Sequence, residues 1–89
     1  MFDDRQRALN RALIYPVQFE RDPVEGIDRV LDQIVRGGAL GGNAAEYAAA
    51  VDAALRSDEP LALLIPQPHS ESVIRTYLAE LRVHLPTPA

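Results

Sequence analysis

The chain has 89 residues, no cysteine and a formal net charge of −4. This length predicts a single domain over residues 1–89, and the lack of cysteine excludes disulfides and thiolate metal ligands, which favours a cytoplasmic setting. The negative charge disfavours binding to nucleic acid, and no apolar stretch approaches the roughly 20 residues of a membrane span. Residues 86–89, which hold two prolines, are expected to fray.

Residues 2–14 are predicted to form a first helix with one broad apolar face. Tyr15 precedes Pro16, and a residue before proline is pushed out of the helical region, so the helix should end by residue 14. Residues 17–21 then form a connector from which Phe19 is expected to enter the core. The apolar face consists of Phe2, Ala8, Leu9, Ala12 and Leu13.

The second helix has a clear start signal. Asp22 can cap it, Pro23 fits the first helical position, and Glu25 completes a capping box. Helical spacing then places one apolar stripe along it, made of Val24, Ile27, Val30, Leu31, Ile34 and Val35. Two acid-to-base pairs at i,i+4 are expected to support it, Glu25 with Arg29 and Asp32 with Arg36.

Four of the five glycines lie in GGALGGN, residues 37–43. A phosphate-binding P-loop would need a lysine where Asn43 stands, and the chain has none. The glycines are therefore predicted to join two helices, with Gly37 as the left-handed residue that ends the second and Leu40 in the core. A binding loop or hinge is the alternative, because glycine allows close backbone approach.

The third helix is predicted to begin with a capping box of the same kind, since Asn43 can cap it and Glu46 follows three residues later. It is predicted to run to about Arg56. Seven alanines between residues 44 and 54 make it thin, so that a neighbour can approach closely. Its inward face is expected to hold Tyr47, Ala48, Val51, Ala54 and Leu55.

Residues 61–65 form a short apolar run that is compatible with a strand or a helical turn. We favour the helical turn, with Leu61, Leu64 and Ile65 inward, because no strand partner is evident. Ser70 is then expected to cap a last helix that ends at the prolines Pro86 and Pro88. Its apolar stripe consists of Val73, Ile74, Tyr77, Leu78, Leu81 and Leu85.

These elements predict an all-α bundle of four main helices and one short helical turn. The expected core contains one or more large side chains from every segment. Its members are Leu13, Phe19, Ile27, Leu31, Ile34, Tyr47, Val51, Leu55, Leu64, Ile74, Tyr77, Leu78 and Leu81.

Catalytic and cofactor motifs are lacking in the sequence. His69 and His84 are too far apart for a metalloprotease-type pair, so both are expected at the surface or at helix ends. The serines stand in capping positions, and no Asp-Ser-Leu occurs at a helix start, as an acyl carrier protein would require. We therefore expect no enzyme activity, no metal and no cofactor.

The middle of the chain is more acidic than the whole. Residues 20–32 hold five acids against two arginines, and residues 46–59 hold four against one, so each segment has a balance of −3. Such a surface attracts a basic partner and accelerates its association. The candidate contacts are Glu25, Asp28, Asp32, Glu46 and Asp52, together with Tyr47 if that side chain is exposed. The alternative is a solvated face that arginines partly neutralise.

The overall pattern resembles the small immunity proteins encoded beside bacterial toxins, including those of contact-dependent growth inhibition systems. The resemblance covers most of the chain and lies in its short helices, its acidic middle (EGIDRVLDQ and NAAEYAAAVDAAL) and its closing amphipathic IRTYLAELRVHL. It implies a non-catalytic protein, monomeric or weakly dimeric, that covers the active site of a basic, nuclease-like toxin.

Two other classes stay open. One is a homodimeric structural or adaptor protein with the alanine-rich helix 44–56 as its packing seam. The other, less favoured, is an enzyme or small-molecule carrier.

Overall fold

The computed structural model describes residues 2–36 and 43–86, in which all regular structure is helical. In these ranges the α-helices are α1 (Asp4–Ile14), α2 (Ile27–Val35), α3 (Ala44–Arg56) and α4 (Glu71–Val83). Three short 3-10 turns join them, η1 (Tyr15–Val17), η2 (Pro23–Gly26) and η3 (Leu61–Leu63). The predicted all-α fold with four main helices is confirmed, and η3 excludes the strand alternative. The predicted roles of Gly37 and Leu40 lie outside the described residues.

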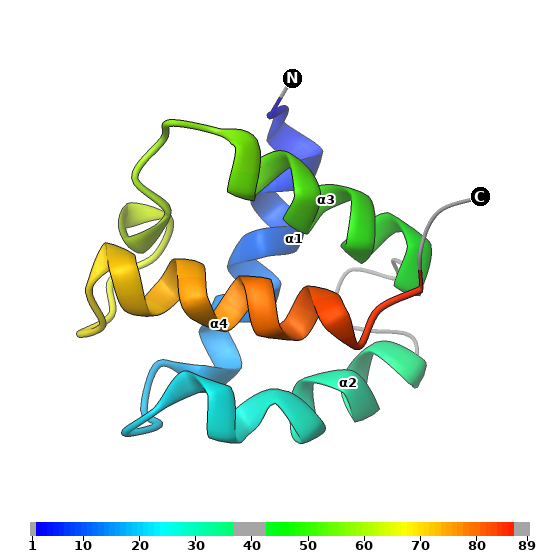
Figure 1. Cartoon of the computed structure of the whole chain (residues 1–89), viewed down its shortest axis with the longest axis horizontal. Helices are drawn as coiled ribbons and strands as arrows, with labels where there is room; N and C mark the ends of the chain where they lie inside the picture. Colours follow the sequence, from blue (N-terminus) through cyan, green and yellow to red (C-terminus); the bar gives the residue numbers. More distant parts are fainter. Residues whose placement is uncertain (1, 37–42, 87–89) are drawn as a thin grey trace.

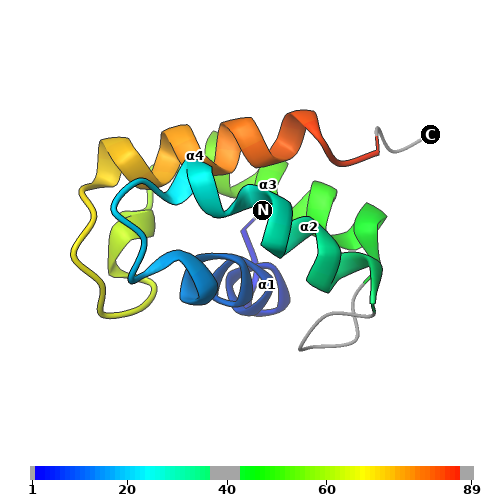
Figure 2. The ribbon, with the colours of Figure 1, turned by 90° about the horizontal axis from the view of Figure 1, so that it is seen from below.

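The helices form two layers. In Figure 1, α4 crosses the middle of the molecule with α3 above it and α2 below it, while α1 runs nearly upright behind them. Figure 2, seen from below, views α1 close to end-on beneath α4. The most extensive packing is that of α1 on α3, followed by α3 on α4. Thus α1 crosses the other helices rather than running alongside them.

Local capping signals explain where the helices begin. Asp3 Oδ1 accepts the backbone N–H of Gln6 at 2.8 Å, and the Gln6 side chain accepts the N–H of Asp3 at 3.0 Å. This capping box starts α1 at Asp4, two residues later than predicted, and the D-x-x-Q pattern could have indicated it. The predicted box of Asn43 and Glu46 is confirmed at the start of α3. Ser70 caps α4 as predicted.

Most of the predicted core is confirmed. The side chains of Leu13, Ile27, Ile34, Tyr47, Val51, Ile74, Tyr77, Leu78 and Leu81 are buried, and Leu31, Leu55 and Leu64 are half-buried against them. Leu9, Ile14, Val17 and Leu61 complete the centre. The Tyr77 hydroxyl donates to the Leu13 carbonyl at 2.6 Å, so the one polar atom of this buried ring is satisfied.

The alanines of α3 allow close helix packing, as expected. Ala48, Ala50, Ala53 and Ala54 are all buried. The α1 side of this contact holds Asn10, which is fully buried and donates from Nδ2 to the carbonyls of Ala50 at 3.0 Å and Gln6 at 2.8 Å. A side-chain hydrogen bond therefore fixes the position of α1 on α3.

The predictions for the α1–α2 connector are wrong in two respects. The first helix ends at Ile14 as predicted, but Tyr15 remains in the helical region, with φ −52° and ψ −46°, and the chain continues into η1. Phe19 is 92% exposed, whereas Val17 is fully buried. The Glu20 N–H donates to the Val17 carbonyl at 3.1 Å and closes a turn that leaves Val17 as the core residue of this segment.

The second helical segment begins at Asp22 and Pro23 as predicted, but its first turn is η2, a 3-10 turn. Asp22 Oδ1 accepts the N–H of Val24 at 3.1 Å. Gly26 is buried in this turn, and a Cβ added there would lie 2.8 Å from Val17 Cγ1. The close approach of η2 to η1 therefore requires a glycine, a constraint that involves a residue nine positions away.

A Glu71–Arg75 pair on α4 holds the irregular segment between α3 and α4. Glu71 accepts the N–H groups of Leu61 and Ala62 at 3.0 and 2.8 Å, and Arg75 Nε donates to it at 2.8 Å. Arg75 also donates from Nη2 to the carbonyls of Ser57 and Glu59 at 2.9 and 3.0 Å. One ion pair thus binds backbone groups at both ends of the connection, which sequence reasoning did not predict.

The end of α4 also differs from the prediction. The helix stops at Val83, before the prolines. Arg82 Nη1 donates to the carbonyl of Leu85 at 3.2 Å, and Leu85 is buried. The chain therefore turns back toward the core, while Val73, predicted inward, is 37% exposed.

Candidate functional site

The acidic side chains predicted to contact a partner lie on three elements. Glu25 belongs to η2, Asp28 and Asp32 to α2, and Glu46 and Asp52 to α3. All except Asp52, which is half-buried, are exposed. In Figure 1, α2 and α3 lie on opposite sides of α4, so the two acidic segments belong to different parts of the molecule.

Arginines neutralise two of these acids at the surface. Asp32 pairs with Arg36 at 3.0 Å, as predicted. Glu46 pairs with Arg5 of α1 at 3.5 Å, and its side chain also belongs to the capping box of α3. Both carboxylates therefore have structural roles, which makes them weaker candidates for recognition.

Asp52 and Tyr47 are the two less exposed candidates on α3. Asp52 accepts from Arg82 Nε at 2.8 Å, and the Asp52 and Arg82 side chains are 35% and 19% exposed. Tyr47 is 2% exposed. Tyr47 is therefore a core residue, and its place among the candidate contacts is corrected: a partner cannot reach it without unfolding the domain.

Glu25 and Asp28 are exposed carboxylates without an ion pair among the described residues. The predicted pair of Glu25 with Arg29 does not form, because Arg29 pairs with Glu20 instead. Asp22 lies next to them in the chain and is also exposed. These three carboxylates form an acidic edge along η2 and the start of α2, named here the η2 edge.

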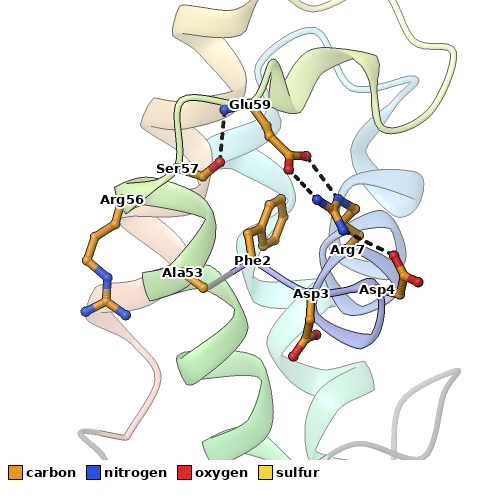
Figure 3. A pocket seen from close by; sticks show the side chains of 8 residues that line it. All are labelled: Phe2, Asp3, Asp4, Arg7, Ala53, Arg56, Ser57 and Glu59. Atoms are coloured by element: carbon orange, nitrogen blue, oxygen red, sulfur yellow. Dashed lines mark hydrogen bonds and ion pairs between the residues drawn. The ribbon is translucent and has the colours of Figure 1, made fainter.

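A surface pocket of about 560 Å³ lies where the chain begins α1 and ends α3. Figure 3 shows Phe2 in its middle, with Arg7 and Glu59 side by side above α1 and Arg56 extending away from them. The Arg7 guanidinium lies 5.2 Å from the centre of the Phe2 ring, within the range of a cation–π contact.

Several polar groups of this pocket bind one another, whereas Arg56 is exposed and has no ion pair among the described residues. Arg7 Nε donates to Glu59 at 3.0 Å, an Nη group makes a second short bond to it, and Arg7 also pairs with Asp4 at 3.1 Å. Ser57 Oγ accepts the Glu59 N–H at 2.9 Å. The hydrogen bonds from Arg7 lower the pKa of Glu59, so the carboxylate stays ionised. These contacts join α1 to the end of α3 and leave few groups to recognise a ligand.

A second pocket, of about 550 Å³, opens between α1 and α2 and is mainly apolar. Its described lining includes the apolar side chains of Ala8, Ala12, Pro16 and Ile65. Arg11 is its one charged lining residue among those described, and Arg11 Nε donates to the Leu64 carbonyl at 3.1 Å. Tyr15 and Gln33 complete the lining. This pocket could not be predicted from the sequence, because its lining residues come from segments far apart in the chain.

The histidines and serines do not assemble a catalytic group in the described ranges. His69 Nε2 lies 3.2 Å from the Val17 carbonyl and His84 follows the last turn of α4, whereas Ser57 and Ser70 accept backbone N–H groups. No cluster of potential metal ligands occurs in residues 2–36 and 43–86. The same residues contain no helix with the length and apolar character needed to cross a membrane.

Comparisons with known proteins give no relative. No family model matches the chain, and neither the curated proteins nor the solved structures contain a significant match. The fold and the surface therefore define the class of this chain, a small all-α protein with an acidic edge and an apolar pocket.

Proposed function

We propose that this chain is a non-catalytic protein-binding module, an immunity protein that neutralises a cognate bacterial toxin in the cytoplasm by covering its active site. The toxin is basic and nuclease-like, and binding requires no cofactor. The proposal rests on one observation: the η2 edge presents Glu25 and Asp28 as exposed carboxylates that no arginine of the described chain neutralises.

The charge of these carboxylates favours a cationic partner. The whole chain carries −4, so its long-range field also attracts basic proteins and repels nucleic acid. Complementary charge mainly accelerates association, and salt screens it. A toxin with a cationic substrate groove would therefore be captured quickly.

The size of the domain is sufficient for such a role. Its accessible surface is 5238 Å². A standard interface takes about 800 Å² from each partner, which is roughly 15% of this surface. One face of the molecule can therefore serve a single partner while the core remains covered.

The homodimer alternative has less support. It requires the alanine-rich helix 44–56 as a seam between two copies. The alanines Ala48, Ala50, Ala53 and Ala54 are already buried inside the protomer, where α1 and α4 cover them. Gel filtration separates the two proposals, since a monomer or weak dimer fits the immunity protein and a tight oligomer fits the adaptor.

The direct test is binding to the protein encoded by the adjacent gene. The variant Glu25→Arg/Asp28→Arg should associate at least tenfold more slowly, because both reversed charges lie on the η2 edge. The control Asp58→Arg/Glu80→Arg reverses two exposed acids elsewhere. Each reversal adds two positive charges, so both variants shift from −4 to 0.

An equal decrease of the association rate in both variants would mean that net charge alone steers association, and the η2 edge would not be the contact. Absence of binding by the wild type would reject the proposed partner. Raising the salt concentration should slow association of the wild type well before it accelerates dissociation.

A further inference from the structure

The apolar pocket between α1 and α2 contains a cation that the protein itself does not neutralise. Arg11 forms no ion pair in the described ranges, although the chain has more acids than arginines. Its Nε–H is donated to the Leu64 carbonyl at 3.1 Å, and this bond restrains the guanidinium beside the pocket. Six other arginines each have a carboxylate partner, namely Arg5, Arg7, Arg29, Arg36, Arg75 and Arg82.

The donors that remain on Arg11 suit a carboxylate. A guanidinium has five N–H groups, and four remain after the bond to Leu64. Two of them can hold a carboxylate in the bidentate geometry that makes such pairs strong. No acidic residue is among the described lining residues, so no carboxylate of this lining repels an anion at short range. The side chains of Gln33 and Tyr15 add polar groups to the same lining.

The walls suit a compact apolar body. The apolar side chains of the lining come from α1, η1 and the segment after η3, and they belong to Ala8, Ala12, Pro16 and Ile65. Gln33 of α2 also lines the pocket. The volume of about 550 Å³ lies within the usual range for small-molecule sites. A peptide helix would instead need a groove several turns long.

We propose that this pocket binds a small apolar carboxylate, such as an alkyl chain with one carboxylate. Arg11 binds the carboxylate group, and Ala8 and Ala12 contact the alkyl chain. General attraction cannot account for such binding, because a protein of net charge −4 repels anions. The site is distinct from the η2 edge, since neither Glu25 nor Asp28 lines the pocket. Either proposal can therefore fail without the other.

The experiment uses the full chain and three probes, decanoate, decanol and acetate, below the concentration at which decanoate forms micelles. Backbone amide shifts in an NMR titration report both affinity and location. Decanoate should shift the amides around Ala8, Ala12 and Ile65 and bind roughly tenfold more tightly than decanol. Acetate, which has the charge without the chain, should cause no saturable shift.

Two matched variants test the role of the charge. Arg11→Gln should weaken decanoate about tenfold and leave decanol unchanged, because only the charge-assisted bonds are lost. Arg21→Gln removes an exposed arginine that has no ion pair in the described chain and does not line the pocket, so it should change neither affinity. Ala12→Phe should block both probes, with circular dichroism used to verify the fold.

Three outcomes would overturn the proposal. Equal affinity for decanoate and decanol would mean that Arg11 does not recognise the carboxylate. Equal weakening by Arg11→Gln and Arg21→Gln would mean that only overall charge matters. Shifts centred away from the pocket, for example around Phe19, would mean that the probe binds an exposed apolar side chain.

Discussion

Gly26 demonstrates at the residue scale how a single missing side chain positions an element. Its backbone is not in the left-handed region, with φ −90° and ψ −1°, so conformation does not demand glycine. Glycine is required at this position because of packing, since an added Cβ would lie 2.8 Å from Val17 Cγ1. Val17 is fully buried and belongs to a stiff β-branched residue type, so it cannot easily move aside.

We therefore expect Gly26→Ala to destabilise the domain. Replacing glycine with alanine restricts the unfolded chain and normally stabilises by about 0.4–1 kcal/mol. Overpacking a core costs about 1–3 kcal/mol, which exceeds that gain. Urea unfolding measures the net change in the free energy of unfolding. The double variant with Val17→Ala should lose less of this free energy than the two single variants added together. Additive effects would show that Val17 is not the obstacle.

A second residue-scale prediction concerns Asp22, which begins η2. Its carboxylate accepts the Val24 N–H at 3.1 Å. Asp22→Ala should cost about 1 kcal/mol, the usual value for losing such a cap. In a domain of this size that loss lowers the melting temperature by roughly 4–8 °C. Asp22→Ser should retain most of the stability, and an alanine variant that melts with the wild type would contradict the cap.

At the scale of elements, Glu71 and Arg75 connect three parts of the chain that have little regular structure between them. The carboxylate holds η3 through the N–H groups of Leu61 and Ala62, and the guanidinium holds the segment after α3. Burial of Glu71 raises its pKa, but the two backbone N–H groups and Arg75 lower it more, so the pKa lies below its usual value.

This lowered pKa predicts how acid weakens the domain. A carboxyl group with a lower pKa in the folded state stabilises the fold above its unfolded pKa of about 4.3. That contribution is lost as the pH falls through the folded pKa. Glu71→Gln should therefore melt at a lower temperature at pH 7 but lose less stability than the wild type between pH 5 and pH 3. If the melting temperatures of Glu71→Gln and the wild type fall in parallel between pH 5 and pH 3, Glu71 is not the acid-sensitive group.

At the scale of the whole molecule, the core depends on side chains from every helix. Leu78 of α4 is fully buried, whereas Leu31 of α2 is half-buried at the edge of the core. The weaker packing of α2 agrees with this difference, since among the described elements its one extensive contact is with η2, which directly precedes it. The two leucines therefore differ in burial, although the sequence pattern predicts both in the core.

We expect Leu78→Ala to cost about 2–5 kcal/mol, because it leaves a cavity among large side chains. Such a loss is a large part of the stability of a small domain. Leu31→Ala should cost distinctly less, since part of its side chain already contacts water. Chemical denaturation of the two variants compares them directly, and equal costs would mean that α2 is packed as firmly as α4.

Features that depend on neighbours in the sequence were predictable. Asn43 with Glu46 and Ser70 begin their helices as expected, and the Asp32–Arg36 pair forms across one turn. Capping and i,i+4 pairs need only residues within a single turn, so they form unless another partner competes, as Glu20 does for Arg29. Apolar spacing likewise identified most of the core, because helical periodicity determines which side chains share a face.

Only the tertiary structure decided which of several competing side chains is buried or paired. Val17 rather than Phe19 enters the core, and Arg29 binds Glu20 rather than Glu25. Arg11 has no carboxylate partner in the described chain and donates to the Leu64 carbonyl instead. These outcomes depend on the distances between segments far apart in sequence, because burial and ion pairing follow from how the helices pack. Local sequence patterns therefore indicate where most helices and caps form, whereas the packing of distant segments creates the apolar pocket and leaves the carboxylates of the η2 edge unpaired.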